Sequence, residues 1–423
     1  MTDATLAVRS TYRLQLGPGF GFAAARGLVG YLADLGVSHV YLSPVLTARP
    51  GSTHGYDVAD PTTVSEALGG EDGLRALADT AHAAGLGIVV DIVPNHLGTG
   101  WDTPLWRQLL AEGHAGEGGR VFDVDWTPAL PGAAGKVIVP VLGDQYGAVL
   151  HRGELTLVEE EGEARLAYHD HRFPLSPESR EALTRSGGIA ALHGTPGVEE
   201  SWQRLHALLE AQHYRLVHWR AGDGLINYRR FFAIDELAAV RVDDPHVFDA
   251  THDTILRLVA DGVVDGLRVD HPDGLADPGR YLRRLAQRSG GVWTVVEKIT
   301  HPGELLPDWD TAGTTGYEFC NDVLGLCVDP GMVHRFDELD AAMGAAPQPY
   351  DEQARRAKRE TLANDLAADA ARLARRLWTL CQAHLDVRDV DDRACLEAVS
   401  ALASAFDVYR TYVDPETGEA AQT

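Results

Sequence analysis

Two short apolar segments organise this chain: Val264-Asp265-Gly266-Leu267-Arg268-Val269-Asp270-His271 and Val292-Trp293-Thr294-Val295-Val296-Glu297-Lys298. Each segment is typical of a buried strand and ends on a carboxylate. Residues 278–288 between them carry apolar side chains at helical spacing, which predicts the crossover helix that parallel strands need. Because α/β proteins bind their ligands at the carboxyl ends of parallel strands, we predict that Asp270 and Glu297 lie in a functional site.

The same alternation of strand and helix begins near the N-terminus. The predicted strands cover residues 11–16, 38–42 and 86–93, and the predicted helices cover 23–35, 71–84 and 249–260. This order is the sequence signature of an α/β protein with a parallel sheet.

A region from about Leu97 to Leu216 interrupts the alternation. Its short apolar runs are separated by Gly turns and predict a β-rich insertion after the third strand, with strands at 136–141, 148–151, 154–158 and 165–169. After Glu297 the pattern predicts a strand at 314–319, helices at 354–383 and 393–405, and a strand at 408–413.

These elements predict a (β/α)8 TIM-type barrel that is incomplete in this chain. They supply at most about seven parallel strands, whereas a barrel of this type closes with eight. The expected parts are a first barrel segment, an insertion after strand 3, a barrel continuation with strands 4 and 5, a helical insertion and the start of a further barrel segment: 1–96, 97–216, 217–330, 331–405 and 406–423.

The composition excludes several partners. With 62 acidic and 37 basic residues the formal charge is -25, which repels nucleic acid and anionic membranes. Four cysteines without metal-ligand spacing, Cys320, Cys327, Cys381 and Cys395, are expected to be free thiols in the core. There is no signal-peptide pattern and no apolar run of about 20 residues, so we expect a cytoplasmic protein with a neutral small-molecule partner.

Three groups of polar residues stand at predicted strand ends. Asp91-Ile92-Val93-Pro94-Asn95-His96, Gly266-Leu267-Arg268-Val269-Asp270 and Glu297 follow in this order, and they closely resemble the first three sequence regions of the α-amylase superfamily. The loop His54-Gly55-Tyr56-Asp57 is similar to the sugar-contacting loop of that superfamily. The segments 224–232 and 266–275 resemble the maltooligosyltrehalose synthase family in particular.

The resemblance implies the activity of that family. Its members isomerise the reducing-end α-1,4 linkage of a maltooligosaccharide to an α,α-1,1 linkage, without a cofactor. Asp270 would be the nucleophile and Glu297 the general acid/base, since retaining glycosyl transfer uses two carboxyls about 5 Å apart. Arg268 would keep Asp270 ionised. A maltooligosyltrehalose trehalohydrolase is the implied pathway partner.

The resemblance also implies residues that bind the substrate. Tyr56 would stack on a sugar ring and His96 would bond to sugar hydroxyls, while Asp91 and Asn95 would either support the loop or contact the sugar. The complete predicted set is Tyr56, Asp57, Asp91, Asn95, His96, Arg268, His271 and Tyr228. Tyr228, Phe231, Phe232, Trp219 and Trp293 each fit a pocket wall or the core.

No metal site is implied. Asn95 resembles a residue that helps to bind calcium in some amylases, but no acidic ligand cluster accompanies it.

The sequence departs from the superfamily pattern in one respect. The third acid, usually on a His-Asp pair, has no match after Glu297, and His252-Asp253 lies on a predicted helix before the nucleophile, where a surface or capping pair is expected. We therefore expect an N-terminal fragment, or one of two pieces, of a longer enzyme. Its activity would then depend on the C-terminal part of the same enzyme, supplied as a separate chain. An amylase-type hydrolase, a 4-α-glucanotransferase and an inactive glucan-binding fragment are the alternatives.

Overall fold

An open parallel sheet lies at the centre of the protein. The computed structural model describes residues 7–185, 188–189, 192–301, 303–344, 348–413 and 417–418. Six strands pair in the order β1-β2-β5-β14-β15-β16, all parallel: β1 (Thr11–Leu14), β2 (His39–Leu42), β5 (Gly87–Ile92), β14 (Gly266–Val269), β15 (Trp293–Val296) and β16 (Gly313–Thr314). The prediction of an incomplete TIM-type barrel is confirmed, because β1 and β16 end the sheet without pairing with each other.

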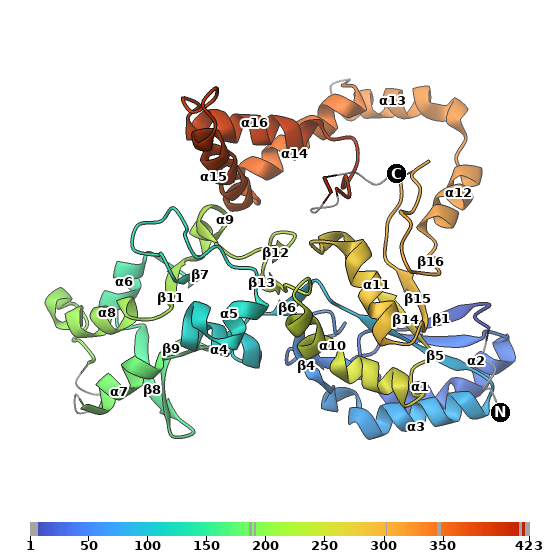
Figure 1. Cartoon of the computed structure of the whole chain (residues 1–423), viewed down its shortest axis with the longest axis horizontal. Helices are drawn as coiled ribbons and strands as arrows, with labels where there is room; N and C mark the ends of the chain where they lie inside the picture. Colours follow the sequence, from blue (N-terminus) through green and yellow to red (C-terminus); the bar gives the residue numbers. More distant parts are fainter. Residues whose placement is uncertain are drawn as a thin grey trace.

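Helices connect and cover these strands (Figure 1). All six residues of β5 are buried, as expected for a central strand covered on both faces. Gly36, at a φ of 87°, ends the second helix in the left-handed conformation that glycine adopts most easily. The helices are α1 (Phe22–Gly27), α2 (Val29–Leu35), α3 (Gly70–Ala83), α10 (Pro245–Ala260) and α11 (Pro278–Arg288).

A separate lobe, on the left of Figure 1, is formed by part of the chain between β5 and α10. It holds an antiparallel sheet of β8 (Leu155–Glu160), β9 (Glu163–Tyr168) and β10 (His171–Pro174), and a parallel pair of β7 (Val137–Leu142) and β11 (Tyr214–His218). The strand predicted at 148–151 is wrong, because α6 (Tyr146–His151) is a helix with Val149 and Leu150 buried on one side.

The lobe also contains four further helices, α4 (Pro104–Glu112), α5 (Glu117–Val121), α7 (Pro177–Arg185) and α8 (Gln203–Glu210). The chain returns through α9 (Gly222–Leu225) and the strands β12 (Arg230–Phe231) and β13 (Ile234–Ala239). β13 pairs with β6 (His96–Gly98), which directly follows the site motif at Asp91. This pairing brings the segment 228–232 next to the carboxyl end of the central sheet.

The late part of the chain is helical and lies above the sheet and the lobe in Figure 1. The strand predicted at 314–319 is only partly correct, since β16 stops at Thr314 and α12 (Tyr317–Cys327) follows. The single helix predicted at 354–383 is broken at residues 364–366. The remaining helices are α13 (Val333–Ala342), α14 (Tyr350–Ala363), α15 (Ala367–Ala383) and α16 (Asp392–Ala405).

The strand predicted at 408–413 is wrong. Residues 408–412 form no strand, and the side chains of Arg410 and Tyr412 bond to Asp273 in the loop after β14. Within the predicted segment 406–423, residues 414–416 and 419–423 lie outside the described residues. Among the described helices, none combines the length and the apolar character needed to cross a bilayer.

Candidate active site

The two predicted catalytic acids follow neighbouring strands at the same edge of the sheet. Val269 on β14 is paired with Val296 on β15, and Asp270 and Glu297 are the next residues on each strand. The backbone N–H of Asp270 donates to Ile92 O and that of Glu297 to Val269 O, both at 2.9 Å. The sheet therefore holds both acids at its carboxyl edge, on strands about 4.8 Å apart.

Arg268 connects the acids through one guanidinium group. Its Nη1 donates to Asp270 Oδ1 at 2.6 Å and to Asp91 Oδ1 at 2.8 Å, and its Nη2 lies 3.2 Å from Glu297 Oε1. The position two residues before Asp270 places both side chains on the same face of the strand. A single buried cation is thus shared by carboxylates from three adjacent strands.

Asp91 is buried and fully engaged. Besides Arg268, it accepts hydrogen bonds at Oδ2 from the hydroxyls of Tyr41, at 2.7 Å, and Tyr56, at 2.6 Å. Burial and the charge of Asp91 raise the pKa of both tyrosines well above the ordinary value, so both stay protonated donors. These contacts favour a supporting role for Asp91.

The surroundings of Asp270 act on the pKa of its carboxyl group in two opposite directions. Burial raises its pKa to about 7, and the neighbouring charges of Asp91 and Glu297 act in the same direction. The hydrogen bond and charge of Arg268 oppose this shift but do not cancel it. Arg268 thus lowers the pKa of Asp270, which is the direction expected from the sequence, but it divides its charge among several carboxylates.

The loop after β5 is held against the sugar-loop candidate. His96 is buried, its Nε2 lies 3.2 Å from Tyr56 O, and burial lowers its pKa to about 3, so the ring is neutral at physiological pH. Asn95 Nδ2 lies 3.3 Å from His96 Nδ1, and Arg229 Nη1 donates to Asn95 Oδ1 at 3.1 Å. Asn95 and His96 therefore lie beside the Asp91 cluster.

His271 turns the chain sharply after the nucleophile. Its φ of 43° is in the left-handed region, which costs a non-glycine residue about 1 kcal/mol. In this conformation its backbone N–H donates to Glu297 Oε2 at 3.2 Å. Its ring is 5.1 Å from that of Phe231 and 5.4 Å from that of Phe232, which makes an aromatic border at this edge.

Two predicted substrate-binding residues lie differently. Asp57 accepts a hydrogen bond from the Ser52 hydroxyl and so organises its own loop. Tyr228 is buried, its ring packs edge-on against Trp106, and its hydroxyl donates to Asp235 O at 2.8 Å. Of the two alternatives for Tyr228, a pocket wall or the core, its burial favours the core of the lobe.

A cavity of about 680 Å³ continues from this cluster into the open sheet. Its walls come from mid-strand positions such as Val89 and Val295, from both sheet edges at Thr11 and Thr314, and from the site residues Tyr56 and Arg268. Trp293 also lines it. The cavity therefore lies against the open sheet, between its two edge strands β1 and β16.

Several site residues had no clear signal in the sequence. Tyr41 belongs to an ordinary apolar strand, and Arg13, which donates to the Tyr56 hydroxyl at 3.1 Å, is exposed polar sequence on β1. Lys298 follows Glu297 directly and is fully buried. A lysine at the end of a buried strand is unusual, because lysine is rarely buried, and this was a signal that the sequence did offer. In the described part of the chain no group of His, Cys, Asp and Glu side chains is arranged to hold a metal ion.

Comparisons with known proteins agree with this geometry. A family model described as the catalytic domain of alpha amylase matches residues 27–104. This match places the chain in the α-amylase superfamily. Within that superfamily the chain is similar in sequence and structure to proteins named as maltooligosyl trehalose synthases.

The relatives give the extent of the similarity. The structure of maltooligosyltrehalose synthase from Arthrobacter ramosus is 40% identical with a TM-score of 0.80, over 96% of this chain and 48% of that one. A Mycobacterium tuberculosis protein named as a maltooligosyl trehalose synthase is 42% identical over 332 residues, 76% of this chain and 39% of the relative. A malto-oligosyltrehalose trehalohydrolase of Rhizobium sp. is 36% identical over 118 residues, which are 27% of this chain and 20% of the relative. The chain thus spans about half the length of the synthases or less.

Proposed function

We propose that this protein serves an intramolecular transglycosylation that converts the reducing-end α-1,4 linkage of a maltooligosaccharide into an α,α-1,1 linkage. The observation that carries this proposal is the pair Asp270 and Glu297, at adjacent strand ends and joined by Arg268, in a relative of the maltooligosyl trehalose synthases. Such a pair of carboxyls suits retaining glycosyl transfer.

In the proposed first step, Asp270 attacks the anomeric carbon that bears the last glycosidic bond. Glu297 gives its proton to the glycosidic oxygen, the bond to the terminal glucose breaks, and the shortened chain becomes an ester of Asp270. In the second step the retained glucose offers its anomeric hydroxyl, Glu297 takes the proton, and the ester bond to Asp270 breaks. Two inversions at one carbon retain the α configuration.

The surroundings support the retention of glucose over hydrolysis. Phe231 and Phe232 pack on His271, and Phe231 also lies 4.4 Å from the ring of His96. An aromatic border of this kind binds the apolar face of a sugar and excludes water from the ester. The expected product, a maltooligosyltrehalose, has the chemistry that a malto-oligosyltrehalose trehalohydrolase would consume.

Product analysis tests the proposal. The protein is incubated with maltooligosaccharides of defined length, and reducing ends, chain lengths and free glucose are measured. Reducing ends that disappear while the number and length of chains stay constant support the isomerisation. Free glucose points to a hydrolase, redistributed lengths to a 4-α-glucanotransferase, and binding without turnover to a glucan-binding fragment, and each of these contradicts the proposal.

A further inference from the structure

We propose that a buried network behind the two acids positions Glu297 for proton donation; this inference rests on the proposed function. The network is centred on Asp273, in the loop after the nucleophile, and we call it the Asp273 network. Its members come from three separate parts of the chain and are Asp273, Lys298, Glu304, Arg410 and Tyr412.

Lys298 is the link to the acid/base. It follows Glu297 directly and its side chain is fully buried. Its Nζ lies 2.7 Å from Glu304 Oε1 and 3.6 Å from Asp273 Oδ2. A buried ammonium group is stable only with such partners, so Lys298 holds the backbone at Glu297 in one place.

The loop after β14 is therefore attached to the end of β15 at two consecutive residues. Glu297 accepts a hydrogen bond from the His271 backbone, and Lys298 pairs with Asp273 two residues further along the same loop. Movement of this loop would shift the carboxyl group of Glu297 relative to Asp270.

A distant segment closes the network from the other side. The Tyr412 hydroxyl donates to Asp273 Oδ1, and Arg410 donates to Asp273 O at 2.6 Å and to Ala276 O at 2.8 Å. Lys298 Nζ also lies 5.7 Å from the centre of the Tyr412 ring. Tyr412 has a φ of 47°, a backbone conformation that persists only where the surroundings hold it.

The two acids depend on the network to different degrees. Asp270 is buried, its N–H is bonded to β5, and its carboxylate is held by Arg268. Glu297 is more exposed, at 24% of its side chain, and its polar contacts include the shared Arg268 and the backbone N–H of His271 in the loop after β14. Loss of the network should therefore impair proton donation by Glu297 more than attack by Asp270.

Two substrates separate these effects. Maltooligosaccharide turnover needs a proton from Glu297 for the leaving oxygen. With α-maltosyl fluoride, the C1–F bond breaks and the Asp270 ester forms while fluoride leaves as an ion, so this step needs little help from an acid. A defect in the positioning of Glu297 slows the first reaction and largely spares the first turnover of the second, so fluoride release is measured as the first-turnover burst. Later turnovers need Glu297 again as the base that frees Asp270 from its ester.

The experiment measures both reactions in Lys298→Met, Lys298→Arg and Tyr412→Phe. We expect maltooligosaccharide turnover by Lys298→Met to fall by about 100-fold and fluoride release by less than about threefold, the scale of general acid catalysis. Lys298→Arg, which keeps the charge, should recover part of the loss. Tyr412→Phe leaves the buried ion pairs in place and should show the same selectivity with a smaller effect.

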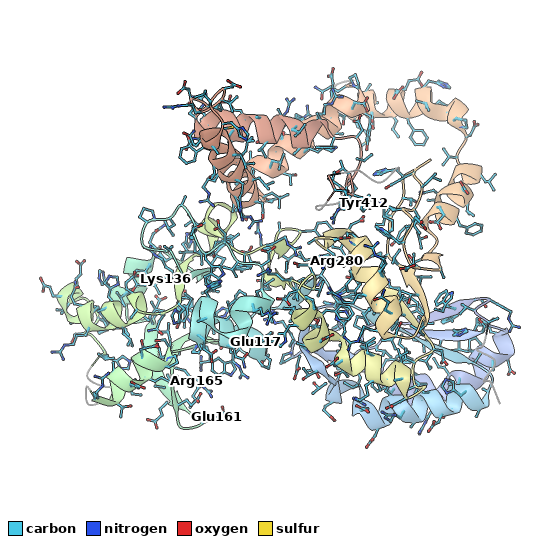
Figure 2. The ribbon with its side chains drawn as sticks, viewed as in Figure 1. Glu117, Lys136, Glu161, Arg165, Arg280 and Tyr412 are labelled. Atoms are coloured by element: carbon cyan, nitrogen blue, oxygen red, sulfur yellow. The ribbon has the colours of Figure 1, made fainter. Side chains whose placement is uncertain are left out.

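Lys136→Met is the matched control. Lys136 also forms a partly buried ion pair, with Glu210 at 3.4 Å, but it lies in the lobe, as Figure 2 shows, far from Tyr412 on the other side of the molecule. Both reactions should proceed at the unmodified rate in this variant. Thermal melting of each variant shows whether it is folded.

The outcomes distinguish this inference from the proposed function. If the unmodified protein carries out both reactions, equal losses on both substrates in Lys298→Met and Tyr412→Phe, or no loss on either, overturn the role of the network. If the unmodified protein neither forms a trehalose-terminated product nor releases fluoride, the proposed function fails and this inference fails with it.

Discussion

At the scale of single residues, the guanidinium group of Arg268 organises the site. It contacts Asp91, Asp270 and Glu297, and therefore compensates only part of the negative charge of each. Asp91 is further satisfied by two tyrosine hydroxyls. The site thus contains a candidate nucleophile, Asp270, whose pKa is raised by burial and by neighbouring negative charge.

Replacement of the nucleophile candidate should abolish covalent chemistry. Asp270→Asn removes the attacking oxygen charge, so we expect turnover to fall by about 10⁴-fold or more and no glycosyl-enzyme to be trapped with an activated fluorosugar. Mass spectrometry of the trapped protein and product assays measure this. Asp253→Asn is the control, because Asp253 is exposed on α10 and ion-paired with Arg288; normal turnover by Asp270→Asn, or a loss in the control, would contradict the assignment.

The raised pKa of Asp270 predicts the acid side of the pH profile. The nucleophile must be ionised, so kcat/KM should fall as the pH decreases through about 7. The negative charge of Asp91 raises the pKa of Asp270. The Asp91→Asn variant should therefore lose activity at a lower pH than the unmodified protein, by about one pH unit. Its maximal rate should be lower. Rates across about pH 5–8, the range in which proteins tend to be most stable, test this. A limb that stays in place or moves to higher pH would refute it.

At the scale of elements, the turn between β14 and α11 carries the site. It contains the left-handed His271 and ends at Asp277, the N-cap of α11, which accepts from the Arg280 N–H at 2.9 Å. One face of α11 is buried through Tyr281, Leu282 and Leu285. His252 on α10 is buried with its Nε2 2.8 Å from the Tyr281 hydroxyl, so it is a core residue, and the expectation of a surface or capping pair is wrong for it.

The cap of α11 can be tested by stability. Asp277→Ala leaves helical N–H groups without the side-chain acceptor, and we expect the free energy of unfolding to fall by about 1 kcal/mol. Asp277→Asn keeps an acceptor and should stay close to the unmodified protein. Denaturant unfolding measures both variants, and equal stability of the Ala and Asn variants would show that the cap contributes nothing.

At the scale of the whole molecule, apolar surface remains uncovered around an open sheet. Large side chains on and beside α12 and α13 are exposed, among them Leu326 at 89% and Phe336 at 67%. In the described part of the chain the sheet order ends at β1 and β16, and neither pairs with a further strand on its outer edge. Exposed apolar patches and open strand edges both favour association.

This surface predicts self-association of the chain as it stands. We expect light scattering to show concentration-dependent oligomers, and Leu326→Lys together with Phe336→Lys to reduce them, because charge disfavours contact between apolar faces. Gln353→Lys on the exposed α14 adds charge without removing apolar surface and should have little effect. A strictly monomeric protein, or equal effects of all three substitutions, would count against this prediction.

Local pattern alone determined much of the protein. Strand periodicity and the order of the motifs placed Asp91, Arg268, Asp270 and Glu297 at the carboxyl ends of β5, β14 and β15, because these strands are continuous, buried and regular. The same reasoning predicted an open barrel from the number of strands. It failed at 148–151, where a short apolar run fits a strand or a helix equally well.

Only the tertiary structure decided which residues complete the site. Tyr41 and Tyr56 meet on Asp91 from different strands and loops, and Tyr412 reaches Asp273 across 139 positions of the chain. Tyr228, in a motif that suggested a sugar contact, is instead buried beside Trp106. Burial and long-range pairing arise when distant segments of the chain pack together, so no local sequence pattern specifies them. They set the pKa of Asp270 and the surroundings of Glu297.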